Sequence, residues 1–125
     1  MTSEAASQQE IRTDAPKHGW QLMRNNVGAT FDRNGRMIRF GLGNDSEALN
    51  EVFKSSDLIG IRPVVVTPEM VGTVIGQFAA VEVKAPGWKQ HPSDTRAQAQ
   101  ARFGAWVEKH GGCFQFATSV GDMRW

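Results

Sequence analysis

The stretch Gln77-Phe78-Ala79-Ala80-Val81-Glu82-Val83-Lys84 has the composition of a buried β-strand. It is short, rich in Val and Phe, and bounded by Gly and Pro residues. Side chains alternate across a strand, so Val81 and Val83 share one face, while Glu82 and Lys84 share the other. A carboxylate and an ammonium at the end of an apolar strand are costly unless they are paired or bind something.

A second apolar strand is predicted over residues 57–61, and it opens with an acid, Asp57. An Asp at one strand start and a Glu-x-Lys on a neighbouring strand can converge on a single point. Two carboxylates about 4 Å apart repel each other, and a divalent cation is the usual remedy. Asp57, Glu82 and Lys84 therefore predict a metal-dependent nuclease site. The alternatives are an exposed edge-strand pair for Glu82 and Lys84, and a turn residue for Asp57.

Two helical residues extend this candidate site. Gln100 lies on one helical stripe with Phe103 and Val107, which predicts that its side chain points towards the sheet. A buried Gln needs hydrogen-bond partners, and a backbone carbonyl is the alternative to a site role. Glu10, on a predicted first helix, is a possible further carboxylate, although a solvated helical Glu is the usual case.

Phosphodiester chemistry suggests a role for each candidate. Asp57, Glu82 and the carbonyl of Val83 supply hard oxygen ligands for Mg²⁺, and Glu10 binds a second metal or a metal-bound water. The metal polarises the phosphoryl oxygen and helps ionise the attacking water. Lys84 orients that water or stabilises charge on the phosphate, and Gln100 positions one of the two.

Composition places the chain among ordinary globular proteins. The 125 residues fit one domain, 1–125, and 40% are apolar and 22% charged. No apolar run approaches the roughly 20 residues of a membrane span, and the polar start, Met1–Glu4, does not read as a signal peptide. The lone Cys113 has no partner for a disulfide or a zinc site, which favours a reducing, cytoplasmic setting.

The net charge of +1 does not by itself indicate binding to nucleic acid, but the distribution of charge along the chain is more informative. Residues 12–39 hold six Lys and Arg against two Asp, and this excess could follow a phosphate backbone. A solvated basic face is the alternative. The candidate DNA-binding residues are Arg12, Arg24, Asn25, Asn26, Arg36 and Lys89.

Periodicity and capping signals predict helices over residues 3–13, 46–54 and 93–110. They predict strands over 20–24, 28–31, 36–40, 57–61, 77–84 and 113–117. Asn34-Gly35 predicts a hairpin turn in which both residues have positive φ. The predicted buried stripes are Leu49, Val52 and Phe53 on the second helix, and Ala99, Phe103, Trp106 and Val107 on the third. This order suits a single α/β domain with a central mixed sheet flanked by helices.

At these residues the sequence resembles the PD-(D/E)XK nuclease superfamily, and more closely its stand-alone virus-type replication-repair nuclease (VRR-NUC) domains of phages and prophages. The matching segments are Gln8–Arg12, Arg24–Ala29, Ser56–Ile61, Phe78–Lys84 and Gln100–Phe103, leading to Gly111-Gly112. Two departures stand out. Ser56 replaces the Pro of the superfamily name, and an insertion at 63–76 lengthens the gap between Asp57 and Glu82.

The resemblance implies a nuclease fold, an active site of Glu10, Asp57, Glu82, Lys84 and Gln100, and Mg²⁺ or Mn²⁺ as cofactor. It also implies hydrolysis of DNA phosphodiesters, with branched DNA such as a four-way (Holliday) junction as substrate. A homodimer in the cytoplasm of a bacterial host, encoded by a phage or prophage, is the implied setting.

Two other functions remain open at this point. One is a catalytically inactive nuclease-fold module that binds DNA. The other is a protein-interaction adaptor that uses the Val64–Val74 insertion as its contact.

Overall fold

The computed structural model describes residues 3–125, so the predicted polar start at Met1 and Thr2 lies outside the described residues. The chain is a small mixed α/β protein that divides into two compact units, one ending at Arg62 and the other spanning Pro63–Trp125. Within residues 3–125 the strands pair as three two-stranded sheets, not as the one central sheet expected. No helix in this range is both long and apolar enough to cross a membrane.

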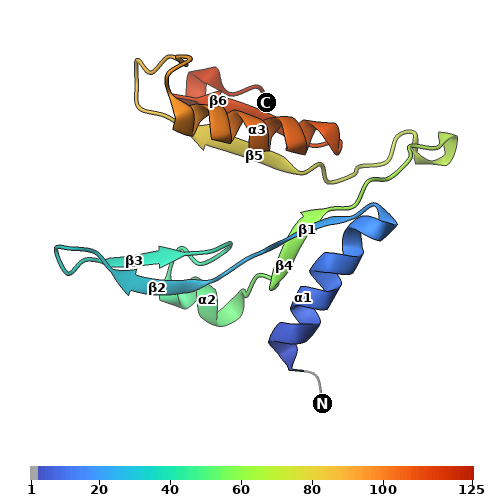
Figure 1. Ribbon diagram of the computed structural model, residues 1–125, viewed down its shortest axis with the longest axis horizontal. Helices are drawn as coiled ribbons and strands as arrows, with labels where there is room; N and C mark the ends of the chain where they lie inside the picture. The colour runs from blue at the N-terminus through green and yellow to red at the C-terminus, as the bar shows by residue number, and fades with distance from the viewer. Residues whose placement is uncertain (1–2) are drawn as a thin grey trace. The chain divides into compact units, whose positions relative to one another are not determined.

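The first unit opens with the helix α1 (Glu4–Asp14), whose N-cap Ser3 accepts a hydrogen bond from the N–H of Ala6 at 3.1 Å. A 3₁₀ turn, Ala15–His18, ends the helix and leads to β1 (Gln21–Arg24). This strand pairs antiparallel with β4 (Leu58–Ile61), and α1 lies beside them (Figure 1). The predicted helix and both strands are confirmed.

The hairpin of β2 (Gly28–Phe31) and β3 (Met37–Phe40) is also confirmed, but its predicted turn is wrong. Only Gly35 has a positive φ, +76°, while Asn34 does not. The carboxylate of Asp32 explains the difference, because it accepts from the N–H groups of Asn34 and Arg36 at 2.9 and 2.8 Å. The side chain therefore organises a longer loop that needs glycine at one position only.

Asn44 is the buried polar centre of the first unit, with 3% of its surface exposed. Its amide nitrogen donates to the carbonyls of Gly28 at 2.8 Å and Phe40 at 2.9 Å. Its side-chain oxygen accepts from the Arg39 guanidinium at 2.6 Å. Asn44 thus ties both strands of the hairpin to the loop that follows, and it satisfies groups that would otherwise be buried without partners.

The short helix α2 (Glu47–Val52) follows, with Ser46 as N-cap. Its predicted buried stripe is largely wrong, because Val52 is 84% exposed and Phe53 57% exposed, and only Leu49 is half-buried. Six residues give fewer than two helical turns, too short to present a continuous apolar face to the hairpin. The helix also ends at Val52, short of the predicted residue 54.

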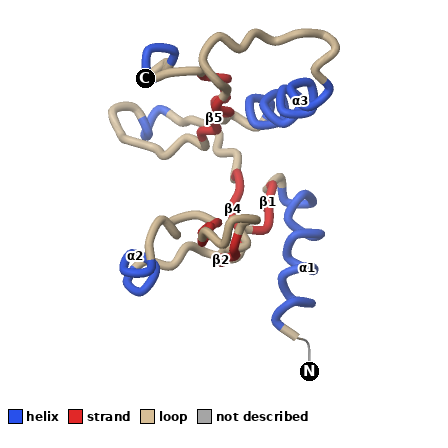
Figure 2. The backbone as a smooth tube through the Cα atoms, turned by 90° about the vertical axis from the view of Figure 1, so that its left-hand side faces the viewer, coloured by secondary structure: helices blue, strands red, loops and turns tan. Residues whose placement is uncertain are grey.

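The second unit holds a βαβ arrangement. The strands β5 (Ala79–Val83) and β6 (Cys113–Ala117) are parallel, and α3 (Thr95–Lys109) connects them and lies along the pair (Figures 1 and 2). Two 3₁₀ turns complete the unit, Pro68–Met70 before β5 and Val120–Asp122 after β6.

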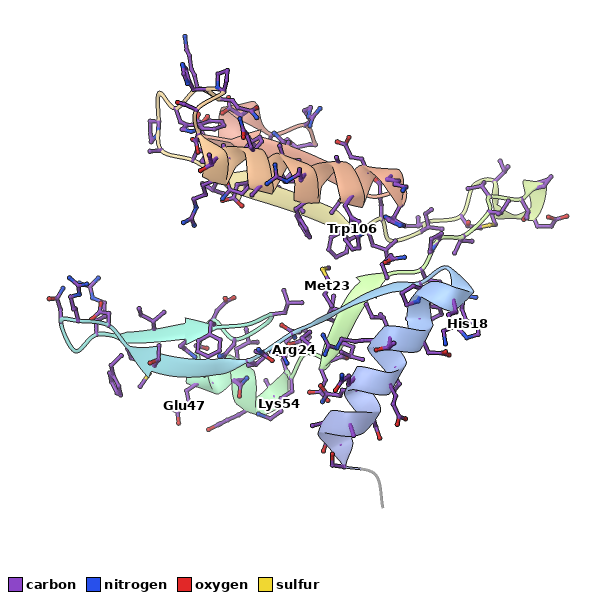
Figure 3. The ribbon with its side chains drawn as sticks, in the orientation of Figure 1. His18, Met23, Arg24, Glu47, Lys54 and Trp106 are labelled. Atoms are coloured by element: carbon purple, nitrogen blue, oxygen red, sulfur yellow. The ribbon has the colours of Figure 1, made fainter. Side chains whose placement is uncertain are left out.

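Close packing of α3 on the sheet depends on small residues. Ala97 and Val107 are fully buried, and a Cβ added to Gly104 would lie 2.2 Å from the ring of Phe114. Of the predicted stripe, Val107 is confirmed and Trp106 is half-buried, projecting from α3 in Figure 3. Ala99 and Phe103 are exposed, and predicting them as buried was wrong. The helix lies so near Phe114 that the inward position belongs to Gly104 instead of its larger neighbour.

The strand that anchored the sequence prediction is less buried than expected. Val81 and Val83 are 42% and 72% exposed, whereas Ala80 and Glu82 are half-buried beneath α3. In this unit the helix covers the face that carries the charged residues. The prediction of a buried strand is therefore wrong for Val81 and Val83, although the predicted alternation is confirmed.

Candidate functional site

Glu82 and Gln100 form the best-defined part of the predicted site. The amide nitrogen of Gln100 donates to Oε1 of Glu82 at 2.8 Å, and both side chains are half-buried. Glu82 projects from β5 towards α3, and Gln100 lies on α3 one turn before Gly104 and two turns before Val107. The inward direction predicted for Gln100 is confirmed. The hydrogen bond fixes one carboxylate oxygen and leaves the other available.

Gln100 and the neighbouring residue Val83 offer two further oxygen atoms. The side-chain oxygen of Gln100 is buried and has no hydrogen-bond partner among residues 3–125. The carbonyl of Phe78 accepts from the N–H of Cys113, and the N–H of Lys84 donates to the carbonyl of Ala117. Because alternate residues of a strand face its partner in a parallel ladder, the carbonyl of Val83 points away from β6, towards the opposite edge of β5. Hard cations prefer carboxylate and carbonyl oxygens, so this donor set fits one side of a Mg²⁺ or Mn²⁺ site.

Lys84 follows β5 directly and is anchored by its N–H, which donates to the carbonyl of Ala117 at 2.9 Å. Its ammonium lies 5.3 Å from the ring centroid of Trp88 and 5.9 Å from that of Phe116. These two rings contact each other, with centroids 5.0 Å apart. We call Lys84, Trp88 and Phe116 the lysine cluster.

Asp57 belongs to the first unit, where it is exposed immediately before β4. Asn25 holds this turn in place. Its N–H donates to the carbonyl of Asp57 at 2.8 Å, and its side-chain amide donates to Ser55 and to the carbonyl of Ser56 at 2.8 and 2.9 Å. The Asn25 side-chain oxygen accepts from the N–H of Leu42 at 3.2 Å. The backbone that carries the Asp57 carboxylate is therefore fixed at both strand ends, β1 and β4.

Glu10 is exposed on α1, also in the first unit. It lines a hollow of about 1020 Å³ beside this helix, together with Ile11, Asp14, Lys17, His18 and Trp20 among others. At the end of α1, Asp14 pairs with Lys17 at 3.3 Å and with His18, which Figure 3 labels, at 3.0 Å. Hydrogen bonding from His18, then from Lys17, lowers the pKa of Asp14. Lys17 and His18 thus pair with Asp14, while Glu10 is exposed and has no ion-pair partner among the described residues.

The candidate DNA contacts are distributed over both units. Arg24 and Asn26 are exposed at the end of β1 and just beyond it, and Arg36 is exposed in the hairpin loop (Figure 3 labels Arg24). Arg12 is half-buried on α1, with no hydrogen-bond partner for Nε among the described residues. Lys89 is exposed after β5.

Asn25 differs from the other candidates. Both polar atoms of its side chain are occupied within the first unit. Its observed role is to fix the turn before β4, and this leaves little capacity for a contact with DNA.

The predicted metal ligands divide between the units. Glu10 and Asp57 are in the first, and Glu82 and the carbonyl of Val83 are in the second. Within residues 3–125 there is no group of three or more His, Cys, Asp or Glu side chains arranged to hold a metal ion. Comparison with family models, with curated proteins and with solved structures finds no match for this chain.

Trp88, Phe116 and Asp94 are not among the residues that the sequence predicts for the site, although the rings of Trp88 and Phe116 lie beside Lys84. Asp94 is the N-cap of α3 and accepts from the N–H of Ala97 at 2.9 Å. This bond lowers the pKa of Asp94, and hydrogen bonding from Trp88 and the charge of Lys84 act in the same direction. Glu82 and Phe116 lie on the predicted strands 77–84 and 113–117, but the sequence does not specify the parallel pairing that brings them side by side.

Proposed function

We propose that this protein is a Mg²⁺-dependent endonuclease that hydrolyses phosphodiester bonds in branched DNA. The observation that carries the proposal is the half-buried Glu82 carboxylate, held by Gln100 beside an unpartnered buried oxygen and two residues before Lys84. A carboxylate maintained in this way beneath a helix is costly for stability alone, and oxygen ligands of this kind suit a hard divalent cation.

The residues divide the chemistry between them. Glu82 and the carbonyl of Val83 would hold Mg²⁺ or Mn²⁺ in the second unit, and Asp57 and Glu10 are the carboxylates of the first unit that the sequence resemblance implies as further ligands. The bound metal would supply charge stabilisation at the phosphoryl oxygen and ease ionisation of the attacking water. Gln100 fixes the orientation of the Glu82 carboxylate, and the ammonium of Lys84 donates to a phosphate oxygen as negative charge develops on it.

The proposal includes the finer fold, a PD-(D/E)XK arrangement spanning residues 1–125, of the VRR-NUC type. The element order supports it. The charged face of β5 lies beneath a helix that carries Gln100, and β5 and β6 are joined by the α3 crossover. The exposed cations Arg24, Arg36 and Lys89 would contact phosphates.

The deciding experiment is cleavage of an end-labelled four-way junction with Mg²⁺, by wild type, Asp57→Ala and Glu82→Ala. We expect cutting by wild type only, with each variant reduced by at least about 100-fold, as for the loss of a principal electrostatic group. Asp45→Ala is the matched control, since Asp45 is an exposed acid outside the candidate site. No cutting by wild type, or full cutting by Asp57→Ala, would reject the nuclease.

A specific surface feature favours self-association. The insertion carries six exposed aliphatic side chains, with exposed fractions from 56% to 97%: Val64, Val65, Val66, Val71, Val74 and Ile75. Contiguous exposed apolar residues are a common mark of protein interfaces. We propose that they contribute to a homodimer, whose two-fold symmetry would match paired cuts in a junction. Light scattering on wild type and Val65→Asp tests this, and a monomeric wild type at micromolar concentration would contradict it.

A further inference from the structure

The lysine cluster has an unusual feature for an ammonium group in a folded protein. Lys84 is half-buried, yet no Asp or Glu in residues 3–125 lies within the 4.0 Å of an ion pair with it. The faces of Trp88 and Phe116 are its partners instead. The charge of Lys84 acts on the Asp94 carboxylate at the start of α3, where it helps to lower the pKa of Asp94.

Two separate structural features build the cluster. Phe116 is the neighbour of Glu82 across the parallel pair, so its ring lies on the same face of the sheet as Lys84. Trp88 returns to this face through a tight turn, in which its N–H donates to the carbonyl of Ala85 at 3.1 Å. Gly87 has φ +84° within that turn, a value that L side chains rarely adopt.

The partners determine what the ammonium can still do. An aromatic face attracts a cation through its quadrupole, but it does not take up the N–H donors as a carboxylate would. The rings therefore restrict the position of Lys84, whose ammonium has no hydrogen-bond partner among residues 3–125, and leave N–H donors available for a negatively charged acceptor such as a phosphate oxygen.

We propose that Trp88 is a positioning residue, which with Phe116 fixes the Lys84 ammonium at the end of β5 with its N–H groups free for phosphate. This inference rests on the proposed nuclease function, because the role of Lys84 does. In this proposal Trp88 acts by positioning the Lys84 ammonium and does not itself contact DNA.

The geometry is tested without any activity measurement. Ring currents from Trp88 should shift the side-chain methylene NMR signals of Lys84 upfield, in the full-length protein labelled with ¹³C and ¹⁵N. We expect this shift to disappear in Trp88→Leu, to persist in Trp88→Phe and to be unchanged in the control Trp125→Leu, since Trp125 is 93% exposed. Lys84→Met identifies the signals. Unshifted Lys84 signals in wild type would overturn the inference.

The positioning role is tested by a double-mutant cycle on junction cutting. We expect Trp88→Leu to lower kcat on the order of tenfold with little change in KM, because misplacing a catalytic group costs rate. Trp88→Phe should retain most of the activity. In the Lys84→Met background, Trp88→Leu should have no further effect, whereas an equal loss in both backgrounds would show a merely structural role and overturn the proposal.

Fluorinated tryptophans placed at position 88 keep the shape of the ring and provide a test that does not depend on Leu being tolerated. Because fluorine weakens the ring quadrupole, kcat should fall stepwise with the number of fluorines, and a flat series would count against the proposal. If wild type cuts no junction, the nuclease and the positioning role both fail. If wild type cuts and the cycle is additive, only the role of Trp88 is rejected.

Discussion

Replacing Asn44 by Ala should destabilise the first unit more than any surface change. The variant loses two donors to the buried carbonyls of Gly28 and Phe40 and one acceptor for the Arg39 guanidinium. Neutral hydrogen bonds contribute about 1 kcal/mol each, and one to a charged group about 1.5–3 kcal/mol. The expected loss is therefore about 3–5 kcal/mol, a large part of the roughly 5–15 kcal/mol that stabilises an ordinary domain.

Amide hydrogen exchange in the β2–β3 hairpin is the appropriate assay, because three of the four tryptophans lie in the second unit and would dominate fluorescence. Opening free energies of the amides of residues 28–31 and 37–40 should fall by the stated amount in Asn44→Ala. Asn44→Asp should also be destabilised, since a carboxylate cannot donate to the two carbonyls.

The matched control is Asn26→Ala, at an exposed position nearby, and it should change stability by no more than about 0.5 kcal/mol. If Asn44→Ala costs less than 1 kcal/mol, roughly the value of one ordinary hydrogen bond, the network does not hold the hairpin. An equal loss in Asn26→Ala would lead to the same conclusion.

Three further outcomes are expected. Gly104→Ala should lower the melting temperature despite the better helix propensity of Ala, because its Cβ would meet the Phe114 ring; overpacking costs about 1–3 kcal/mol against a propensity gain of about 1. The pKa of Asp94 is lowered from its ordinary 3.8 in the folded state. The stability that this carboxylate contributes to the folded protein is therefore present above pH 3.8 and is lost as the pH falls through the folded-state pKa. Acid titration by circular dichroism should show that loss in wild type and not in Asp94→Asn, which keeps the cap. Gln100→Leu should weaken Mn²⁺ binding in calorimetry by about tenfold, because the Glu82 carboxylate loses its orienting partner, and unchanged affinity would count against that role.

Local patterns in the sequence predicted the elements well, because caps and alternation act over a few residues. The predicted helices 3–13 and 46–54 begin after the N-caps Ser3 and Ser46, and the strand 113–117 is confirmed at the residues expected. The inward direction of Gln100 also followed from helical spacing. Its partner Glu82 lies 18 residues earlier, and strand alternation placed it on one face with Lys84 without specifying that α3 covers that face.

Burial was predicted less well, because it depends on which elements meet. Phe103 and Gly104 are neighbours on α3, and choosing the larger apolar residue as the buried one overlooked how closely the helix approaches Phe114. Val81 was expected to be buried because Val is common in cores. Its burial depends on which strands and helices pack against β5, and the periodicity of the sequence does not specify those long-range partners. Asn44 gave no signal beyond the Gly41-Leu42-Gly43 run before it.

The parallel pairing of β5 with β6 has a consequence for biosynthesis. The strand that bears Glu82 obtains its backbone partner only from residues 113–117, after the whole of α3 has been made. During translation β5 therefore remains unpaired with β6 until residues 113–117 have been made. A chain interrupted before Cys113 would carry Glu82, Gln100 and Lys84 without the strand that pairs with β5.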